Sequence, residues 1–232
     1  MHLAVAANVV LKLALLPAVA VMLVFPDLPQ FEGKSLTLRA ILYPIFAIAP
    51  YAVYRLKRMH GPYPTVVDLC WTWIFTLDIV SNDLNWYNAY TWWDDLIHFV
   101  NALPYMAVLT AALLALEERG VIRLGFWGAM LVAFSAFTAF HAVWEMWEHL
   151  MDRFLQTQLQ PGGMAEATEN NLAGMAGGLL AIVVLRRLAG AFHRRAILPL
   201  AAYVAQLRPP RGSEDRQEER VLQRGVQLRP LA

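Results

Sequence analysis

The sequence predicts an all-α polytopic transmembrane bundle of about six spans, with both termini in the cytoplasm. Of the 232 residues, 58% are hydrophobic and 16% are charged, whereas a soluble domain of this length carries about a quarter charged residues. The mean hydropathy is +0.43. The apolar residues occur in runs long enough to cross about 30 Å of hydrocarbon, and short polar connections separate these runs. We therefore expect a multi-pass protein whose main partner is the lipid bilayer.

The apolar runs define the predicted spans in chain order. The first lacks a basic start and is longer than the core of a signal peptide, so we expect it to be retained as a helix. Within it, Lys12 either extends to the nearer interface or pairs with Asp68 on a neighbouring helix. The six predicted spans are residues 3–25, 38–56, 65–86, 94–116, 121–150 and 168–188.

The chain is predicted to have three parts. Residues 1–190 form the bundle, and residues 191–207 form an interfacial segment because their apolar stretch is too short to span. Residues 208–232 are polar and form a cytoplasmic tail. The single cysteine, Cys70, excludes an intramolecular disulfide. The net charge of +1 and the dispersed basic residues give no indication of a nucleic-acid partner.

Basic residues concentrate in alternate connections, and this pattern predicts the orientation. By the positive-inside rule, these connections and both termini face the cytoplasm. The third and fifth spans then end at the outer face, where the fourth and sixth begin. The basic residues concerned are Arg55, Lys57, Arg58, Arg119, Arg123, Arg186, Arg187, Arg194 and Arg195.

The end of the fifth span carries an unusual pattern. In residues 141–152, HAVWEMWEHLMD, acids and histidines follow one another at spacings of four, three, one and three. On an α-helix, these side chains fall within about a third of the circumference. They are His141, Glu145, Glu148, His149 and Asp152. We interpret Asp152 as a solvated interfacial charge and the others as one wall of a buried polar site.

Three other helices bring polar side chains to the same predicted depth. The third and fourth spans each carry a stripe at spacings i, i+4 and i+7, which places each stripe on one helix face. The sixth span begins with polar residues and continues with glycines that permit close helix packing. Aromatic residues between the third and fourth spans are expected to anchor the interface. The polar residues are Asp78, Asn82, Asn85, Asp94, His98, Asn101, Glu166, Glu169, Asn170 and Asn171.

The residue types in this cluster indicate a metal site. Carboxylates and imidazoles that face one another in a low-dielectric setting must pair, share protons or bind a cation. Mixed nitrogen and oxygen ligands suit zinc, iron or manganese, and helical bundles build such sites from facing helices. The candidate metal ligands are His98, Glu145, Glu148, Asp94, His141 and His149. A metal-free hydrogen-bonded or proton-handling network and an organic-ligand site remain alternatives.

Residues 93–99, WDDLIHF, resemble the aromatic-Asp-Lys-x-x-His-Phe signature of VanZ-like membrane proteins and of the YjdF family of uncharacterised inner-membrane proteins. The YjdF family also has a Glu-x-x-Glu motif, matched here by Glu145 and Glu148, and then an Asp-Thr-x-x-Asp motif. The resemblance covers residues 65–190. It implies a multi-pass protein of the bacterial cytoplasmic membrane and a site that includes Asp94, His98, Glu145 and Glu148.

The sequence departs from that family pattern at two places. Asp95 stands where the signature has lysine, which adds a negative charge beside the site. Ala167 and Asn171 stand where the later motif has aspartates, and Glu166 and Glu169 are their candidate substitutes. The contribution of the sixth span to the site is therefore left open.

Three classes of function are compatible with the sequence. The first is a metal-binding or metal-dependent membrane protein, and the second is a non-catalytic accessory or assembly subunit of a larger membrane complex. The third is an enzyme acting on a lipid or cell-envelope substrate, with a carboxylate or metal-bound water as base. A transporter is disfavoured because neither repeated halves nor broken helices are visible in the sequence.

Overall fold

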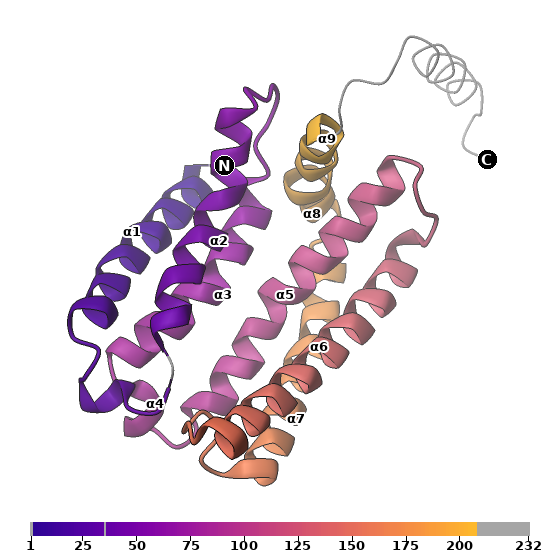
Figure 1. The fold of residues 1–232 in the computed structure, drawn as a ribbon. Coiled ribbons are helices and arrows are strands. Elements are labelled where there is room, and N and C mark those ends of the chain that lie inside the picture. Colours follow the sequence, from indigo (N-terminus) through magenta and orange to yellow (C-terminus); the bar gives the residue numbers. More distant parts are fainter. Residues whose placement is uncertain (1, 35, 208–232) are drawn as a thin grey trace, which may run out of the picture.

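The computed structural model describes residues 2–34 and 36–207, and in this part of the chain all regular secondary structure is helical, without a strand (Figure 1). This arrangement confirms the predicted all-α bundle. The long helices are α1 (His2–Val24), α2 (Leu36–Leu56), α3 (Thr65–Asp83), α5 (Trp93–Glu118), α6 (Gly125–Leu155) and α7 (Gly163–Arg187). The shorter elements are η1 (Pro29–Phe31), α4 (Trp86–Ala89), α8 (Ala189–Phe192), η2 (His193–Ile197) and α9 (Leu198–Leu207).

Five of the described helices are long and apolar enough to cross a membrane: α1, α2, α5, α6 and α7. The remaining long helix, α3, packs between α1 and α5, and it carries Asp68, Asp78 and Asp83, which make it less apolar. The chain is therefore a multi-pass membrane protein with five candidate spans. A count of six spans and the cytoplasmic location of both termini stay predictions.

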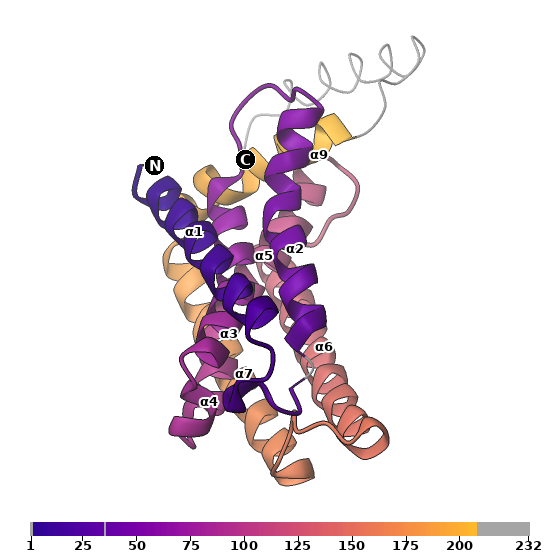
Figure 2. The ribbon, with the colours of Figure 1, turned by 60° about the vertical axis from the view of Figure 1, so that its left-hand side comes forward.

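The long helices form two groups that meet along α3 and α5. Helices α1, α2 and α3 pack on one another on one side, and α5, α6 and α7 do so on the other (Figures 1 and 2). Each group has its own apolar core. In the first, Leu15 and Met22 of α1 pack with Ala40 of α2 and Ile79 of α3. The site described below lies where the two groups face each other.

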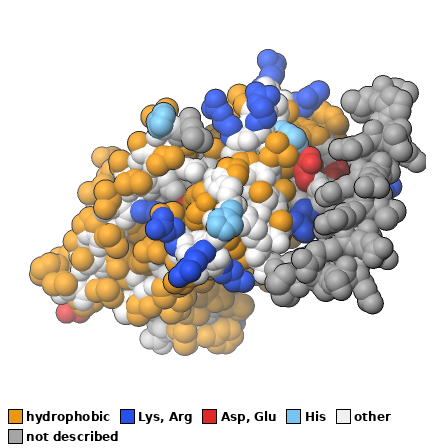
Figure 3. All heavy atoms as spheres, turned by 90° about the horizontal axis from the view of Figure 1, so that it is seen from above, with side chains coloured by type: hydrophobic (Ala, Val, Ile, Leu, Met, Phe, Trp, Pro, Cys, Tyr) orange, Lys and Arg blue, Asp and Glu red, His pale blue; other side chains and the backbone are white. Residues whose placement is uncertain are grey.

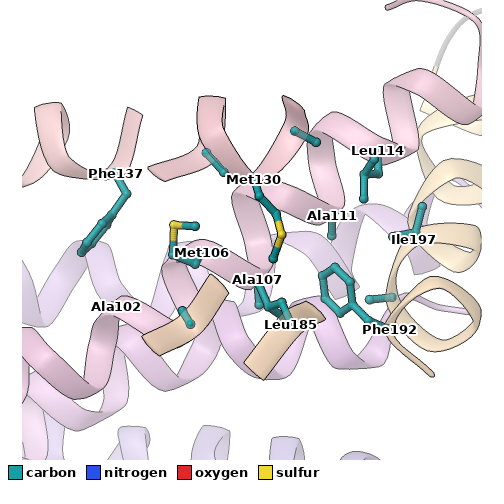
Figure 4. Packing of buried hydrophobic residues seen from close by; sticks show 14 residues of the cluster. Ala102, Met106, Ala107, Ala111, Leu114, Met130, Phe137, Leu185, Phe192 and Ile197 are labelled. Carbon is teal, nitrogen blue, oxygen red and sulfur yellow. The ribbon is translucent and has the colours of Figure 1, made fainter. Parts of the chain in front are cut away.

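The core of the second group is built mainly from small side chains and methionines (Figure 4). Met106 of α5 and Met130 of α6 are almost completely buried in it. Gly177 of α7 brings α7 against the backbone of α5, because a Cβ at this position would overlap the carbonyl oxygen of Phe99. The predicted small-residue face of this helix therefore makes the close contact expected of it.

The segment 191–207 folds back onto the bundle. It contains α9, which packs against α5, and its side chains Phe192, Ala196 and Ile197 belong to the core of the second group. The interfacial placement predicted for this segment remains untested. The predicted tail, residues 208–232, lies outside the described residues.

Lysine and arginine side chains gather at one end of the bundle, the face seen in Figure 3. Arg55 in the last turn of α2 is exposed there, as are Lys57 and Arg58 just after α2 and Arg123 before α6. The carboxylates and histidines of the predicted site lie toward the opposite ends of the same helices. The basic residues from which the orientation was predicted thus lie together at one end of the bundle, and the orientation itself stays a prediction.

The structure corrects one local expectation and decides between the two alternatives given for Lys12. The third predicted span, 65–86, ends earlier, at Asp83, and Asn85 adopts a left-handed backbone conformation with φ 58°. Asn85 therefore does not continue the stripe of Asp78 and Asn82. Lys12 does pair with Asp68, with 2.6 Å between Nζ and Oδ2, and Asn8 donates a hydrogen bond to the same oxygen. Of the two alternatives for Lys12, the structure selects the ion pair.

Candidate metal centre

Two helices of the second group bring two imidazoles and a carboxylate together. His141 and Glu145 lie one turn apart on α6, and His98 lies on the facing side of α5. One potential ligand atom from each residue lies within 4.8 Å of the other two. Glu145 Oε1 is 3.4 Å from His98 Nε2 and 3.7 Å from His141 Nε2. The i, i+4 spacing that the sequence predicted therefore does place two of the candidate ligands on one face.

The two oxygens of the Glu145 carboxylate have different surroundings. Oε2 accepts hydrogen bonds from Gln160 Nε2 at 2.7 Å and from Asn170 Nδ2 at 3.3 Å. Oε1 is buried, has no hydrogen-bond donor among the described residues and faces the two histidines. Because the residue is only 1% exposed, water does not solvate this oxygen. The surrounding amides thus orient the carboxylate and leave one buried oxygen in need of a positively charged partner.

The imidazole of His141 is held between three neighbours. Its Nε2 contacts Nδ1 of His98, and its ring stacks on Phe137 with 5.7 Å between centroids. Gly174 of α7 lies against the other side of the ring, where a Cβ would approach Cε1 to 2.7 Å. The glycine that the sequence suggested for helix packing therefore also leaves room for this imidazole.

Asp94 extends the triad by one turn along α5. Its Oδ1 lies 3.5 Å from His98 Nε2, and its Oδ2 accepts a hydrogen bond from Asn170 Nδ2 at 2.8 Å. The amide of Asn170 thus bridges the carboxylates of Asp94 and Glu145, although it stands between Ala167 and Asn171, the two positions at which the resemblance expects acids. Through Asn170, the sixth predicted span does contribute to the site.

The remaining candidates divide between two places. Glu148 is buried and faces Arg39 of α2, with 3.0 Å between Oε1 and Nη2. His149 is half-buried and does not belong to the triad. The structure therefore brings His98, His141, Glu145 and Asp94 together, directs Glu148 to an ion pair beside them, and leaves His149 outside.

Arg39 connects the two helix groups and was not anticipated from the sequence. It pairs with Asp78 of α3 as well as with Glu148, and its guanidinium lies 5.4 Å from the ring centroid of Trp144. Tyr87, one of the aromatic residues between the third and fourth predicted spans, donates a hydrogen bond to Asp78 at 3.0 Å, and its anchoring role stays a prediction. The sequence did contain one signal for Arg39. It is a charged residue near the start of an apolar run, and such residues mark functional or paired positions.

Asp152 organises the loop between α6 and α7. Its carboxylate accepts hydrogen bonds from the Thr157 hydroxyl at 2.5 Å and from the backbone amides of Leu159 at 2.8 Å and Gln160 at 2.7 Å. The interpretation as a free solvated charge was wrong, because the sequence does not reveal that the loop folds back. By fixing Gln160, Asp152 indirectly positions the Glu145 carboxylate.

A cavity of about 880 Å³ lies between the two helix groups and reaches this cluster. His98, His141, Asp94 and Glu148 line one end of it, together with Arg39. Other walls come from α3, α4 and the connections before α2 and after α6. The two imidazoles of the triad are therefore accessible from this cavity, whereas Glu145 lies behind them and does not line it.

Comparison with known proteins identifies a family but no activity. A family model described as "Predicted membrane protein (DUF2238)" matches residues 8–191. The matched region includes every candidate ligand named above. Neither the search of curated proteins nor the search of solved structures finds a match.

Proposed function

The chain belongs to the DUF2238 family of predicted membrane proteins, and we propose that it binds one divalent transition metal through His98, His141 and Glu145. Asp94 is the candidate fourth ligand. The observation that carries the proposal is the Glu145 carboxylate, whose Oε1 is buried, has no donor within residues 2–34 and 36–207, and is directed at two imidazoles. A metal ion supplies the positive charge that this oxygen lacks.

The distances support an ion of the size of zinc, iron or manganese. Tetrahedral ligands at ~2.0–2.1 Å from a metal are separated from one another by ~3.3–3.4 Å. The two distances from Glu145 Oε1 to the imidazole nitrogens are 3.4 and 3.7 Å. Both distances are close to this spacing, and coordination by both imidazoles additionally requires the contact between His141 Nε2 and His98 Nδ1 to open. Two nitrogen ligands also favour a transition metal over calcium or magnesium, which prefer oxygen.

The groups around the triad have the character of an outer ligand shell. Amides from Gln160 and Asn170 hold one oxygen of Glu145, and Asn170 also holds Asp94. Such contacts orient metal ligands, and their loss typically lowers metal affinity about 10- to 100-fold. With His98, His141 and Glu145 as the only protein ligands, the fourth position of a tetrahedral metal stays open toward the cavity, as in catalytic rather than purely structural sites, whereas coordination by Asp94 would close it.

The competing account is a metal-free network. The contact between His141 Nε2 and His98 Nδ1 is compatible with a hydrogen bond between two neutral imidazoles. In that account, His98 Nε2–H points to Asp94 and Glu145 over 3.5 and 3.4 Å. These distances are long for hydrogen bonds, and Oε1 of Glu145 remains without a close donor. The metal account leaves no such buried group, and we prefer it for that reason.

Elemental analysis of the purified full-length protein tests the proposal. The protein is produced in medium supplied with zinc, iron and manganese, purified in detergent without chelator, and compared with Glu145→Gln and His149→Gln. The glutamine at position 145 keeps the size of the side chain but removes its charge. The matched control changes a histidine one turn further along α6 that lies outside the triad.

We expect about one metal ion per chain in the wild type and in His149→Gln, and less than a tenth of that in Glu145→Gln. Metal at background level in all three proteins, although each is monodisperse and folded, would reject the metal site in favour of the hydrogen-bonded network. An equal metal content per chain in all three proteins would mean that other residues bind the ion.

A further inference from the structure

The cavity between the helix groups changes in chemistry along its length. Near the proposed metal it is lined by charged side chains, among them Lys34 and Arg39. Toward the middle of the bundle it is lined by Trp71 of α3, Leu109 of α5 and Ala136 of α6. Along α5 alone the lining extends from position 94 to position 109, which is about 22 Å of helix. The cavity is thus long and amphipathic.

The apolar end of the cavity borders the lipid-facing surface. Phe46 of α2 and Phe140 of α6 line it, and their exposed fractions are 43% and 54%. Both helices are candidate spans, but α2 packs on α1 and α3, whereas α6 packs on α5 and α7. Arg39 joins α2 to α6 only at the polar end, through Glu148 and Trp144. A hydrocarbon chain can therefore enter the cavity from the bilayer between these two helices.

The polar end contains a cation that lacks an acceptor. The Nζ atom of Lys34 is buried and has no hydrogen-bond partner among the described residues, and it lies 5.3 Å from the ring centroid of Tyr87. Burial lowers the pKa of Lys34, and the carboxylate of Asp78 acts in the opposite direction. An ammonium group only donates hydrogen bonds, so a group that satisfies it must bring acceptor oxygens.

From these observations we infer that the cavity binds a phospholipid, with a hydrocarbon chain along the apolar wall and the phosphate between Lys34, Arg39 and the metal. The length supports this occupant, because about 22 Å accommodates a head group and a chain that reaches across half of the ~30 Å hydrocarbon core. This inference rests on the proposed function for one of its three cationic groups, the metal.

The phosphate is favoured over other head groups by the donors present. A head group carrying only positive charge offers no acceptor to Lys34, and an uncharged glycerol offers weaker ones. A phosphate presents several acceptor oxygens, which suits an ammonium, a guanidinium and an open metal position together. The carboxylates of Asp78 and Glu148 already offset part of the Arg39 charge, so Lys34 and the metal are the groups that need the ligand.

Native mass spectrometry of the full-length protein in detergent tests the inference. The probes are dioleoyl phosphatidic acid, dioleoylglycerol with the same chains but no phosphate, and inorganic phosphate alone. Two matched pairs of variants separate the contribution of the hydrocarbon chain to binding from that of the head group. Ala136→Trp fills the apolar wall, whereas Ala139→Trp changes an exposed alanine of the same helix that does not line the cavity. Lys34→Gln removes the buried ammonium, whereas Lys57→Gln changes an exposed lysine at the other end of α2.

We expect phosphatidic acid to bind at least tenfold more tightly than dioleoylglycerol, and inorganic phosphate to bind more weakly than either lipid. Ala136→Trp should abolish lipid binding and Lys34→Gln should weaken phosphatidic acid binding about tenfold or more, with both controls unchanged. Ala136→Trp binding lipid like the wild type would overturn the inference. Equal binding of the two lipids, unaffected by Lys34→Gln, would overturn the phosphate assignment.

Metal content measured on the same samples keeps this inference separate from the proposed function. If metal-loaded protein binds phosphatidic acid equally well with alanine or tryptophan at position 136, the lipid site is contradicted and the metal site is left intact. Metal-free protein that binds phosphatidic acid in a manner sensitive to both Ala136→Trp and Lys34→Gln contradicts the metal site and supports the lipid site.

Discussion

Gly174 of α7 lies directly against the imidazole of His141 on α6, where a Cβ would come within 2.7 Å of Cε1 and 2.8 Å of Nδ1. The contact ties the packing of two helices to the position of a proposed ligand. A methyl group at this position displaces the ring, because the backbone of α7 is itself pressed against α5 at Gly177.

Gly174→Ala is therefore expected to lower metal affinity about 10- to 100-fold, as loss of ligand orientation typically does. The measurement is a competition titration of the purified protein with a chromophoric chelator. Gly190→Ala is the control, since the nearest atom to a Cβ there is Arg194 Nη1 at 3.6 Å, an ordinary contact. Wild-type affinity in folded Gly174→Ala would show that the position of His141 does not matter for the metal.

Asn170 is expected to act on the metal through two carboxylates. Its Nδ2 donates to both Asp94 and Glu145, so Asn170→Ala frees both side chains. The same titration should show a loss of about 10- to 100-fold. Thr168→Ala, an exposed position on the same helix, should bind metal like the wild type. If both variants retain full affinity, the amide bridge has no role in orienting ligands.

The ion pair of Lys12 and Asp68 is expected to stabilise the first helix group independently of the metal. Asp68 is 3% exposed and its Oδ2 accepts from Lys12 and Asn8. Lys12→Met leaves a buried carboxylate without its cation, and breaking such a pair costs about 3–5 kcal/mol. Thermal unfolding in detergent should show a clearly lower melting temperature for Lys12→Met than for the wild type. Adding Asp68→Asn should restore part of that melting temperature. A double variant less stable than Lys12→Met would contradict this account.

The fold was largely predictable because its signals are local. Runs of apolar residues set five candidate spans with bounds close to those expected, and the predicted helix at residues 121–150 is α6. The errors lie at helix ends. The third helix stops at Asp83 rather than at residue 86, because the chain turns at Asn85 with a positive φ that the residue pattern does not announce.

The candidate site was predictable only where ligands share a helix. His141 and Glu145 follow from their i, i+4 spacing, and Asp94 and His98 from the same rule. Which neighbouring helix supplies the remaining groups depends on tertiary packing. The Arg39–Glu148 ion pair joins residues 109 positions apart, and Gln160 reaches Glu145 only because Asp152 folds the loop back. Local spacing carries no information about either contact.

The central claim, a metal held by two imidazoles and a carboxylate, is tested most directly by X-ray absorption spectroscopy of the metal that co-purifies with the protein. We predict nitrogen and oxygen neighbours at about 2.0–2.2 Å, outer-shell scattering from two imidazoles, and no sulfur neighbour at about 2.3 Å. His141→Gln should leave the scattering of one imidazole. A sulfur ligand, or two imidazoles persisting in His141→Gln, would contradict the assignment.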